Sequence, residues 1–357
     1  MERRFRLSGF PQQTDFNNAL DAEILATISA AARDAPPAHQ ETLSVYDIML
    51  YHLGFLDEQF KPNRSDVGKR IRPLLCVLAC EASGGEQRVA MPMAAAIELL
   101  HNFTLIHDDI QDQSPLRRHR PTVWSLWGIA QAINAGDAMF ATAHLALMRS
   151  LDAGVPTERV LALSRSLHDT TLRIVEGQVL DLGFETRSDV TADEYMQMIG
   201  GKSAAICRCA CWAGATIAGA KPGDAEVIGE AGYALGVGFQ LRDDILGIWG
   251  APDATGKAAA DDIRRRKKSL PILLLHDRAS AGDRETIEHL YNEQEVPPDG
   301  VEQILNMLDE YQVEEAVQEQ AHNWHDRATS LIQSSLGSGP ARDALEQLVG
   351  ALVARVG

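Results

Sequence analysis

The stretch Glu98-Leu-Leu-His-Asn-Phe-Thr-Leu-Ile-His-Asp-Asp-Ile-Gln-Asp112 ends an amphipathic helical pattern with three acidic residues. Asp108 and Asp112 are four residues apart, so a helix places both carboxylates on one face, one turn from each other. Because like charges at this spacing repel, another factor should favour the arrangement, and a divalent cation such as Mg²⁺ is the natural candidate. The alternative is a solvated acidic helix end, since the pattern DDxxD also occurs by chance.

The helical pattern around this stretch continues along the chain in both directions. Segments of roughly 15–25 residues, rich in Ala, Leu and Ile, alternate with short breaks that contain Gly, Pro, Asp or Ser. Alternating strand patterns bounded by hairpin turns are missing, so the sequence predicts an all-α fold, a large single-domain helical bundle around a central apolar cavity. The predicted helices are residues 17–34, 41–59, 72–83, 89–113, 121–152, 156–184, 191–219, 223–249, 269–279, 283–293, 299–314, 315–336 and 339–355.

The Ala- and Pro-rich segment 31–40 predicts the only domain boundary. It separates an N-terminal arm, residues 1–40, from the helical domain, residues 41–357.

The composition excludes several classes of protein. The 357 residues include 33 Lys and Arg against 50 Asp and Glu, and the net charge of −17 argues against nucleic acid as a partner. No apolar run approaches the ~20 residues that span a bilayer, so we expect no transmembrane segment. Five cysteines are too few for a secreted disulfide scaffold, and Cys207, Cys209 and Cys211 spread around a helix axis. We therefore expect buried, reduced thiols and a cytoplasmic location.

Basic residues accompany the first acidic cluster. Arg117 and Arg118 begin five residues after Asp112, and arginine offers planar forks of donors to phosphate oxygens. Upstream, Gly68-Lys-Arg-Ile-Arg-Pro73 opens a predicted helix with three cations, at the helix end that favours anions. Carboxylates and arginines on either side of a short loop are expected where both hold one polyanion. A surface salt-bridge patch is the alternative.

A second acidic pair lies in the stretch Phe239-Gln-Leu-Arg-Asp-Asp-Ile-Leu-Gly247, where glycine stands in place of a third acid. Between the two clusters, Gly200-Gly-Lys-Ser203 predicts an interrupted helix whose lysine can reach a phosphate, although it lacks the spacing of a P-loop. Lys257 and the charged run 261–268 follow, and such a run by itself is most often a solvated face. Two acidic clusters with separate basic groups predict substrates that are rich in phosphate.

This ordered series of motifs resembles that of the trans-isoprenyl diphosphate synthases, the polyprenyl synthetase family, over about residues 40–350. The resemblance implies the isoprenoid synthase fold and a prenyltransferase that joins isopentenyl diphosphate head-to-tail to an allylic diphosphate. It implies Mg²⁺ as the cofactor, about three ions with substrate bound, held by Asp108, Asp112 and Asp243. It assigns catalytic roles also to Asp109, Arg117, Lys202 and Asp244.

The same match, position by position, implies the substrate contacts. For isopentenyl diphosphate they are Lys69, Arg72, His101 and Arg118. For the allylic diphosphate they are Arg117, Lys202, Ser203, Gln240, Lys257 and Lys267, and Glu176–Asp181 matches the GQxxDL element of the family.

Three residues depart from the pattern of the family. Gly247 replaces the last acid of the second cluster, which implies weaker or altered Mg²⁺ binding but retained activity, because the first acid of that cluster makes the direct contact. His119 stands where glycine is usual and Trp124 where histidine is usual. With these two residues, the sequence does not determine the local conformation of the loop.

Product length is expected to depend on the floor of an apolar pocket below the first cluster. Phe103 lies five residues before Asp108, ~7.5 Å along the helix axis, and Leu100 lies about one turn further. This pattern resembles geranylgeranyl diphosphate synthases, with farnesyl diphosphate and longer products as alternatives. Phe103 can equally be an ordinary core aromatic.

Two other functions remain open from the sequence. A class I terpene cyclase shares the fold and the metal-binding acids, but it has no use for the four residues matched to isopentenyl diphosphate. A catalytically silent partner subunit is expected to lose acids of the first cluster, and all three are present here. Both observations favour a condensing enzyme, for which the family resemblance also implies a homodimer.

Overall fold

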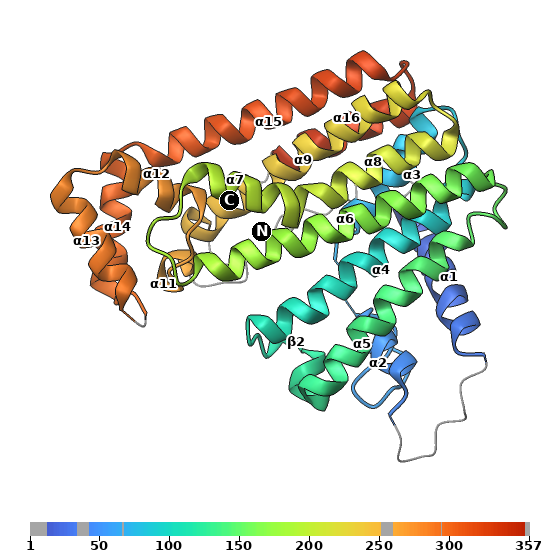
Figure 1. Ribbon diagram of the computed structural model, residues 1–357, viewed down its shortest axis with the longest axis horizontal. Helices are drawn as coiled ribbons and strands as arrows, with labels where there is room; N and C mark the ends of the chain where they lie inside the picture. Colours follow the sequence, from blue (N-terminus) through green and yellow to red (C-terminus); the bar gives the residue numbers. More distant parts are fainter. Residues whose placement is uncertain (1–12, 34–42, 66–67, 251–259, 294, 354–357) are drawn as a thin grey trace, which may run out of the picture. The chain divides into compact units, whose positions relative to one another are not determined.

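The computed structural model describes residues 13–33, 43–65, 68–250, 260–293 and 295–353, and these residues are almost entirely helical (Figure 1). The all-α prediction is confirmed. The helices are α1 (Gln13–Ala31), α2 (Val45–His52), α3 (Ile71–Ala82), α4 (Gln87–Gln111), α5 (Val123–Met148), α6 (Thr157–Phe184), α7 (Ala192–Ile199), η1 (Gly200–Ala204), α8 (Ala205–Ala218), α9 (Pro222–Trp249), α11 (Asp261–Arg264), α12 (Leu270–Arg278), α13 (Ala281–Asn292), α14 (Pro298–Glu310), α15 (Val313–Ser335) and α16 (Pro340–Val353).

The described residues form two compact units. One comprises residues 13–168 and 213–222, and the other comprises residues 169–212 and 223–353. The predicted division into an arm and one helical domain stays a prediction.

The first unit is built around α4, which packs against α3 and lies beside α5 (Figure 1). Residues 90–100 of α4 are buried without interruption. Contrary to the expectation from sequence, this helix is long and apolar enough to cross a membrane, but 72% of its most apolar window is buried inside the protein. α4 is therefore the core helix of its unit, and its end carries the first acidic cluster.

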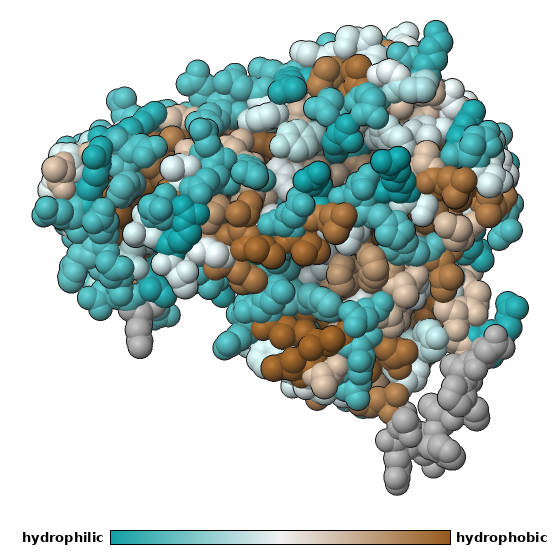
Figure 2. All heavy atoms as spheres, viewed as in Figure 1, coloured by the Kyte–Doolittle hydropathy of each residue, from teal (hydrophilic) through white to brown (hydrophobic). Residues whose placement is uncertain are grey.

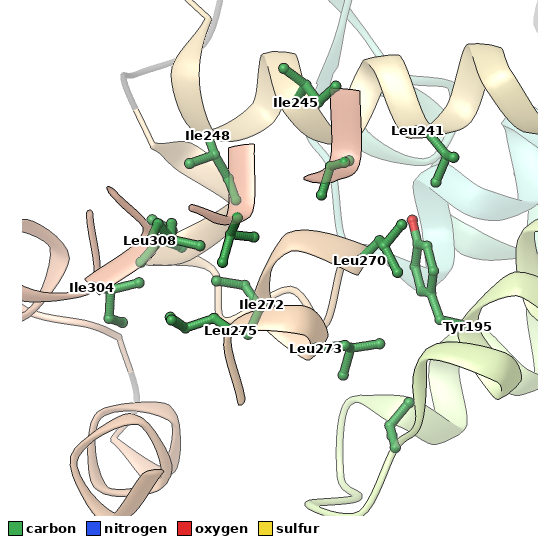
Figure 3. Packing of buried hydrophobic residues seen from close by; sticks show 14 of the residues in the cluster. Tyr195, Leu241, Ile245, Ile248, Leu270, Ile272, Leu273, Leu275, Ile304 and Leu308 are labelled. Carbon is green, nitrogen blue, oxygen red and sulfur yellow. The ribbon is translucent and has the colours of Figure 1, made fainter. Parts of the chain in front are cut away.

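The core of the second unit gathers where α9, α12, α14 and α15 meet. Figure 3 shows Leu241 and Ile245 of α9 above Leu270 and Ile272 of α12. Tyr195 of α7 lies beside Leu270, with its hydroxyl oxygen directed towards α9. Burial of each such aliphatic side chain contributes about 1.5–3 kcal/mol, so this apolar layer holds the end of α9 and its acidic pair in place.

Several helix predictions were wrong in detail. The helix predicted at residues 41–59 is only α2, because Gly54 has a φ of +80° and ends it. The helix predicted at residues 121–152 begins at Val123 and is kinked at Gly128, which has a φ of +84°. The short helix α11 was missed. The strand-free prediction also missed a two-residue antiparallel ladder, β1 (Leu116–Arg117) with β2 (Arg120–Pro121).

Candidate active site

The first acidic cluster occupies the last turn of α4. Asp112 caps this helix, where it is exposed, Asp108 is partly buried, and Asp109 is buried. The carboxyl end of a helix carries unpaired carbonyl groups and the negative end of the helix dipole, so three acids there raise the local negative potential further. This position suits cations, and the metal-binding role of Asp108 and Asp112 stays a prediction.

Asp109 faces the protein and holds Arg117. Nε and Nη2 of Arg117 both lie 2.8 Å from Oδ1 of Asp109. Burial raises the pKa of Asp109 to about 6, and the charge of Arg117 opposes this rise. Asp109 therefore fixes the guanidinium of Arg117 beside the cluster.

The loop after the cluster is a tight hairpin, and of the two residues that depart from the family pattern His119 lies in it and Trp124 in the first turn of α5. Arg118 and His119 have φ values of +51° and +62°, a conformation that favours glycine, the usual residue at position 119 in the family. Nε1 of Trp124 donates a hydrogen bond to the carbonyl oxygen of Ser114 at 2.9 Å. Trp124 thus ties the start of α5 to the loop, and the hairpin keeps its form despite both departures.

Three of the predicted contacts for isopentenyl diphosphate, Arg72, His101 and Arg118, lie close together in the first unit. Nη1 of Arg72 lies 3.2 Å from Nε2 of His101, and because a guanidinium only donates, this nitrogen of His101 is the acceptor. Burial and the nearby charge of Arg72 lower the pKa of His101 well below its ordinary value, so the ring is neutral. Gly68 lies against Arg118, since a Cβ at Gly68 would be 2.5 Å from Nη2 of that arginine.

A small cavity of about 30 Å³ lies between the first cluster and the hairpin. Two residues that line it, His52 and Asn102, were not predicted from the sequence. Burial, and then the charges of nearby arginines, lower the pKa of His52 to about 3, so this ring is also neutral. The cavity is lined by Tyr51, His52, Asn102, Leu105, Asp109, Arg117, Arg118, Arg120, Pro121 and Thr122.

The second acidic pair lies near the end of α9 in the other unit. Asp243 is partly buried, whereas Asp244 is fully buried. Asp244 accepts hydrogen bonds from the hydroxyl of Tyr195, from Nζ of Lys267 at 3.3 Å and from Nε2 of Gln240 at 3.4 Å. Burial raises the pKa of Asp244, and the charge of Lys267 opposes the rise. This acid anchors its neighbours, and Asp243 remains the metal-binding candidate of the pair.

Lys202 lies in the π-helical turn η1, which interrupts the helix at the glycine pair as predicted. Its ammonium forms an ion pair with Asp181 of α6. The backbones approach closely here, since a Cβ at Gly177 would be 2.9 Å from Cα of Lys202. Oγ of Ser203 donates a hydrogen bond to Oε1 of Gln240 at 2.8 Å. The structure thus brings Lys202, Ser203 and Gln240 together with the second acidic pair.

The missing third acid of the second cluster has a steric explanation. A Cβ at Gly247 would lie 2.5 Å from Cγ of Asp262, a buried acid of α11. Lys267 binds this carboxylate at 3.5 Å as well as Asp244. Burial alone lowers the pKa of Lys267, but Asp244 and Asp262 raise it, so its net pKa is above the ordinary value and the ammonium stays charged. Lys257 lies outside the described residues.

The residues predicted for the floor of the pocket are packed below the first cluster. Leu100 is completely buried in α4. The ring of Phe103 lies 5.2 Å from that of Phe140 on α5 and 4.8 Å from that of His107, centroid to centroid. Phe140 lies 4.6 Å from His144 in turn. An aromatic stack therefore continues from Phe103 into α5.

The motif order, the helical fold and these two groups of charged residues match one family. The family model for polyprenyl synthetases matches residues 55–308. The chain belongs to the polyprenyl synthetase family. It is an enzyme, a trans-prenyl diphosphate synthase of the short-chain type, and the resemblance stated from the motifs is confirmed.

Similar proteins carry two product names. A (2E,6E)-farnesyl diphosphate synthase of Mycobacterium tuberculosis is 41% identical over 269 residues, 74% of this chain and 73% of that protein. A geranylgeranyl diphosphate synthase of the same species is 40% identical over 232 residues, 65% of each chain. The crystal structure of a geranylgeranyl pyrophosphate synthetase from Pyrococcus horikoshii superposes with a TM-score of 0.84 at 29% identity, covering 97% of this chain and 98% of that one.

Proposed function

We propose that this synthase joins isopentenyl diphosphate head-to-tail to an allylic diphosphate and releases geranylgeranyl diphosphate. The observation that carries the product length is the aromatic stack that begins at Phe103, five residues before Asp108. A growing apolar chain that passes below the first cluster along α4 meets this stack after ~7.5 Å of helix. Farnesyl diphosphate and longer products are the alternatives, and the measured chain length of the product distinguishes them.

In the reaction, the allylic carbon–oxygen bond breaks and diphosphate leaves with the bonding electrons. The double bond of isopentenyl diphosphate attacks the resulting cation, and loss of one proton restores a double bond. Arg117, Lys202 and Lys267, which match the allylic diphosphate contacts of the family, would hold the leaving diphosphate through charge-assisted hydrogen bonds. Asp109, Asp181 and Asp244 keep these three cations oriented in the free enzyme, so little reorganisation is needed when substrate binds.

The acids of the two clusters fit Mg²⁺ in their chemistry. Mg²⁺ takes one or two carboxylates together with phosphate oxygens and water, and no three acidic, histidine or cysteine side chains converge into a closed metal cage in the described parts of the chain. Asp108, Asp112 and Asp243 would hold the Mg²⁺, about three ions with substrate bound. The metal would neutralise charge on the departing diphosphate.

The second diphosphate group needs a separate cationic site, because isopentenyl diphosphate keeps its diphosphate throughout. Lys69, Arg72 and Arg118 would supply the charges of this site. Neutral His101 accepts a hydrogen bond from Arg72 and so orients this arginine without adding a charge of its own. The segment Asp262–Lys267 is proposed to cover the allylic site and exclude water, which otherwise captures the cation.

A homodimer is supported by an exposed apolar stripe on α6. Leu161, Leu172, Val175 and Val179 are 64%, 61%, 47% and 65% exposed, and their spacing places them within roughly 60° of arc on one helix face. Figure 2 shows apolar side chains gathered in a band over α6. Such a stripe on a helix is typical of a subunit interface. The free, buried cysteines support a cytoplasmic location.

The decisive experiment incubates the purified protein with isopentenyl diphosphate, Mg²⁺ and dimethylallyl, geranyl or farnesyl diphosphate in turn. Product lengths are measured by mass spectrometry. The expected main product has about twenty carbons with every primer, because each reaction ends at the same aromatic stack. Elongation with no primer would reject the synthase and favour a silent subunit, and cyclic hydrocarbons from an allylic substrate alone would favour a terpene cyclase.

A further inference from the structure

Helix α1 lies outside the residues that the family model matches, which begin at residue 55. It packs on α4 and α5 of the same unit. Its buried apolar side chains repeat every four residues, at Phe16, Leu20, Ile24 and Ile28, which is the spacing of one helix face. This face orients α1 so that one buried acid on it, Asp21, reaches the loop of the first diphosphate-binding motif.

That loop, residues 68–70, leads directly into α3 and contains a residue in an unfavourable conformation. Arg70 caps the start of α3 with a φ of +50° and a ψ of +40°, which costs a residue other than glycine about 1–2 kcal/mol. Its side chain is only 2% exposed, and a guanidinium does not lose its proton in proteins. A buried charge on a strained backbone persists only where neighbouring groups hold it.

α1 supplies two of the groups that hold Arg70, and the buried carboxyl of Glu98 on α4 also interacts with its charge. Nη2 of Arg70 lies 2.5 Å from Oδ1 of Asp21, and Nη1 donates to the backbone carbonyl oxygen of Asn17 at 3.4 Å. Asp21 also lies 3.8 Å from Arg64, but the side chain of Arg64 is 77% exposed, so that pair contributes little. The contacts of α1 therefore converge on the middle residue of the motif.

The residues on either side of Arg70 are the ones assigned to isopentenyl diphosphate. Lys69 precedes it, and Arg72, which contacts His101, lies two residues after it. The backbone torsions of Arg70 set the relative directions of the side chains of Lys69 and Arg72. A rotation at this position changes the spacing of the two cations, and a misplacement of about 1 Å lowers the efficiency of such a site strongly.

We propose that Asp21 of α1 is a positioning residue for the diphosphate of isopentenyl diphosphate. It acts through Arg70, whose left-handed backbone it stabilises, and through Arg70 it sets the placement of Lys69 and Arg72. This inference rests on the proposed function, which assigns those two cations to that diphosphate. It makes α1 part of the substrate site although α1 touches no substrate.

The test compares four full-length variants by steady-state kinetics with each substrate varied in turn. Asp21→Asn removes the charge, and Asp21→Glu restores it. Glu23→Gln is the matched control, since Glu23 lies on the same helix and pairs with Arg149 at 2.6 Å, outside the motif loop. Lys69→Ala reports on the diphosphate site itself. Melting temperatures are measured in parallel, because both charge-removing variants of α1 lose ion pairs.

Asp21→Asn is expected to raise KM for isopentenyl diphosphate roughly tenfold, with KM for the allylic substrate changed less than about twofold. Asp21→Glu should recover most of the loss, and Glu23→Gln should change neither KM. If Lys69→Ala raises KM for isopentenyl diphosphate and Asp21→Asn does not, the positioning role is rejected while the substrate assignment stands. If Lys69→Ala has no effect, the assignment itself fails and this inference fails with it.

Arg70→Lys is a second variant that tests the same proposal if Asp21→Asn does not fold. A lysine retains the charge but lacks the planar fork of donors with which arginine binds Asp21 and Asn17 at once. The same selective rise in KM for isopentenyl diphosphate is expected. Equal changes in both KM values would show a general loss of structure and would contradict the proposal.

Discussion

Restoring the missing acid of the second cluster should damage this enzyme. Gly247→Asp would complete the DDxxD pattern, and sequence reasoning alone predicts stronger Mg²⁺ binding from it. The structure predicts the opposite, because a Cβ at Gly247 would lie 2.5 Å from Cγ and 2.9 Å from Oδ1 of Asp262. Two carbon atoms in contact need ~3.5 Å, so Asp262 has to move by about 1 Å.

The displacement reaches the binding site through Lys267. Asp262 is buried and lies 3.5 Å from Nζ of Lys267, which also binds Asp244. A shift of about 1 Å in a group that positions substrate lowers turnover by up to a hundredfold. The new carboxylate would also lie beside two buried acids and add repulsion. We expect kcat/KM for the allylic substrate to fall by roughly one to two orders of magnitude.

The assay separates this steric effect from a general effect of replacing a helical glycine. Gly247→Ala should lose activity and melt at a lower temperature. Gly183→Ala is the control, since a Cβ at Gly183 meets no atom within 4 Å, and such a change in a helix stabilises by about 0.5–1 kcal/mol. A Gly247→Asp enzyme with unchanged melting temperature and full activity would refute the reasoning.

Four further predictions follow from the site and the surface. Asp108→Ala should reduce turnover about a hundredfold or more, and activity near that of the wild type would reject its metal role. Phe103→Ala should lengthen the products seen by mass spectrometry, whereas an unchanged length would place the floor elsewhere. The pKa of His52 is lowered to about 3 in the folded state, so its contribution to stability is present above pH ~6.5 and is lost as the pH falls towards 3. His52→Asn should therefore flatten the decline of melting temperature between pH 7 and 4. An unchanged slope would contradict this. Leu172→Glu should give monomers in light scattering, whereas Leu25→Glu on α1 should not.

The sequence predicted long periodic helices well and their interruptions poorly. α6 and α9 were predicted to within a residue or two, since each has a strong periodic pattern that starts next to a proline. The helix around residues 41–59 was overextended because apolar residues continue past Gly54, and only the positive φ of that glycine ends it. Local periodicity contains no information about such a backbone conformation.

The chemistry of the site was predictable where it depended on local motifs. The acids, Arg117 and Lys202 were singled out from their spacing in the sequence, and Gln240 from its match to the family's motifs. Tyr195 was missed because it lies 49 residues from its partner Asp244, and Asp21 was missed for the same reason, since it lies in an unrelated helix. Contacts of this kind form only when distant helices pack, and no pattern within one segment predicts them.

The π-helical turn η1 sets the direction of the Lys202 side chain towards Asp181. A π turn holds one more residue than an α-helical turn, so α8 is rotated by about 100° relative to the uninterrupted helix that would continue α7. Deleting one residue of the pair Gly200–Gly201 would restore regular hydrogen bonding and yield a helix that is more stable by itself. The same deletion would turn Lys202 away from its partner. The irregular turn thus trades local helix stability for the direction of one cationic side chain, and a search for stabilising deletions in this enzyme should leave it intact.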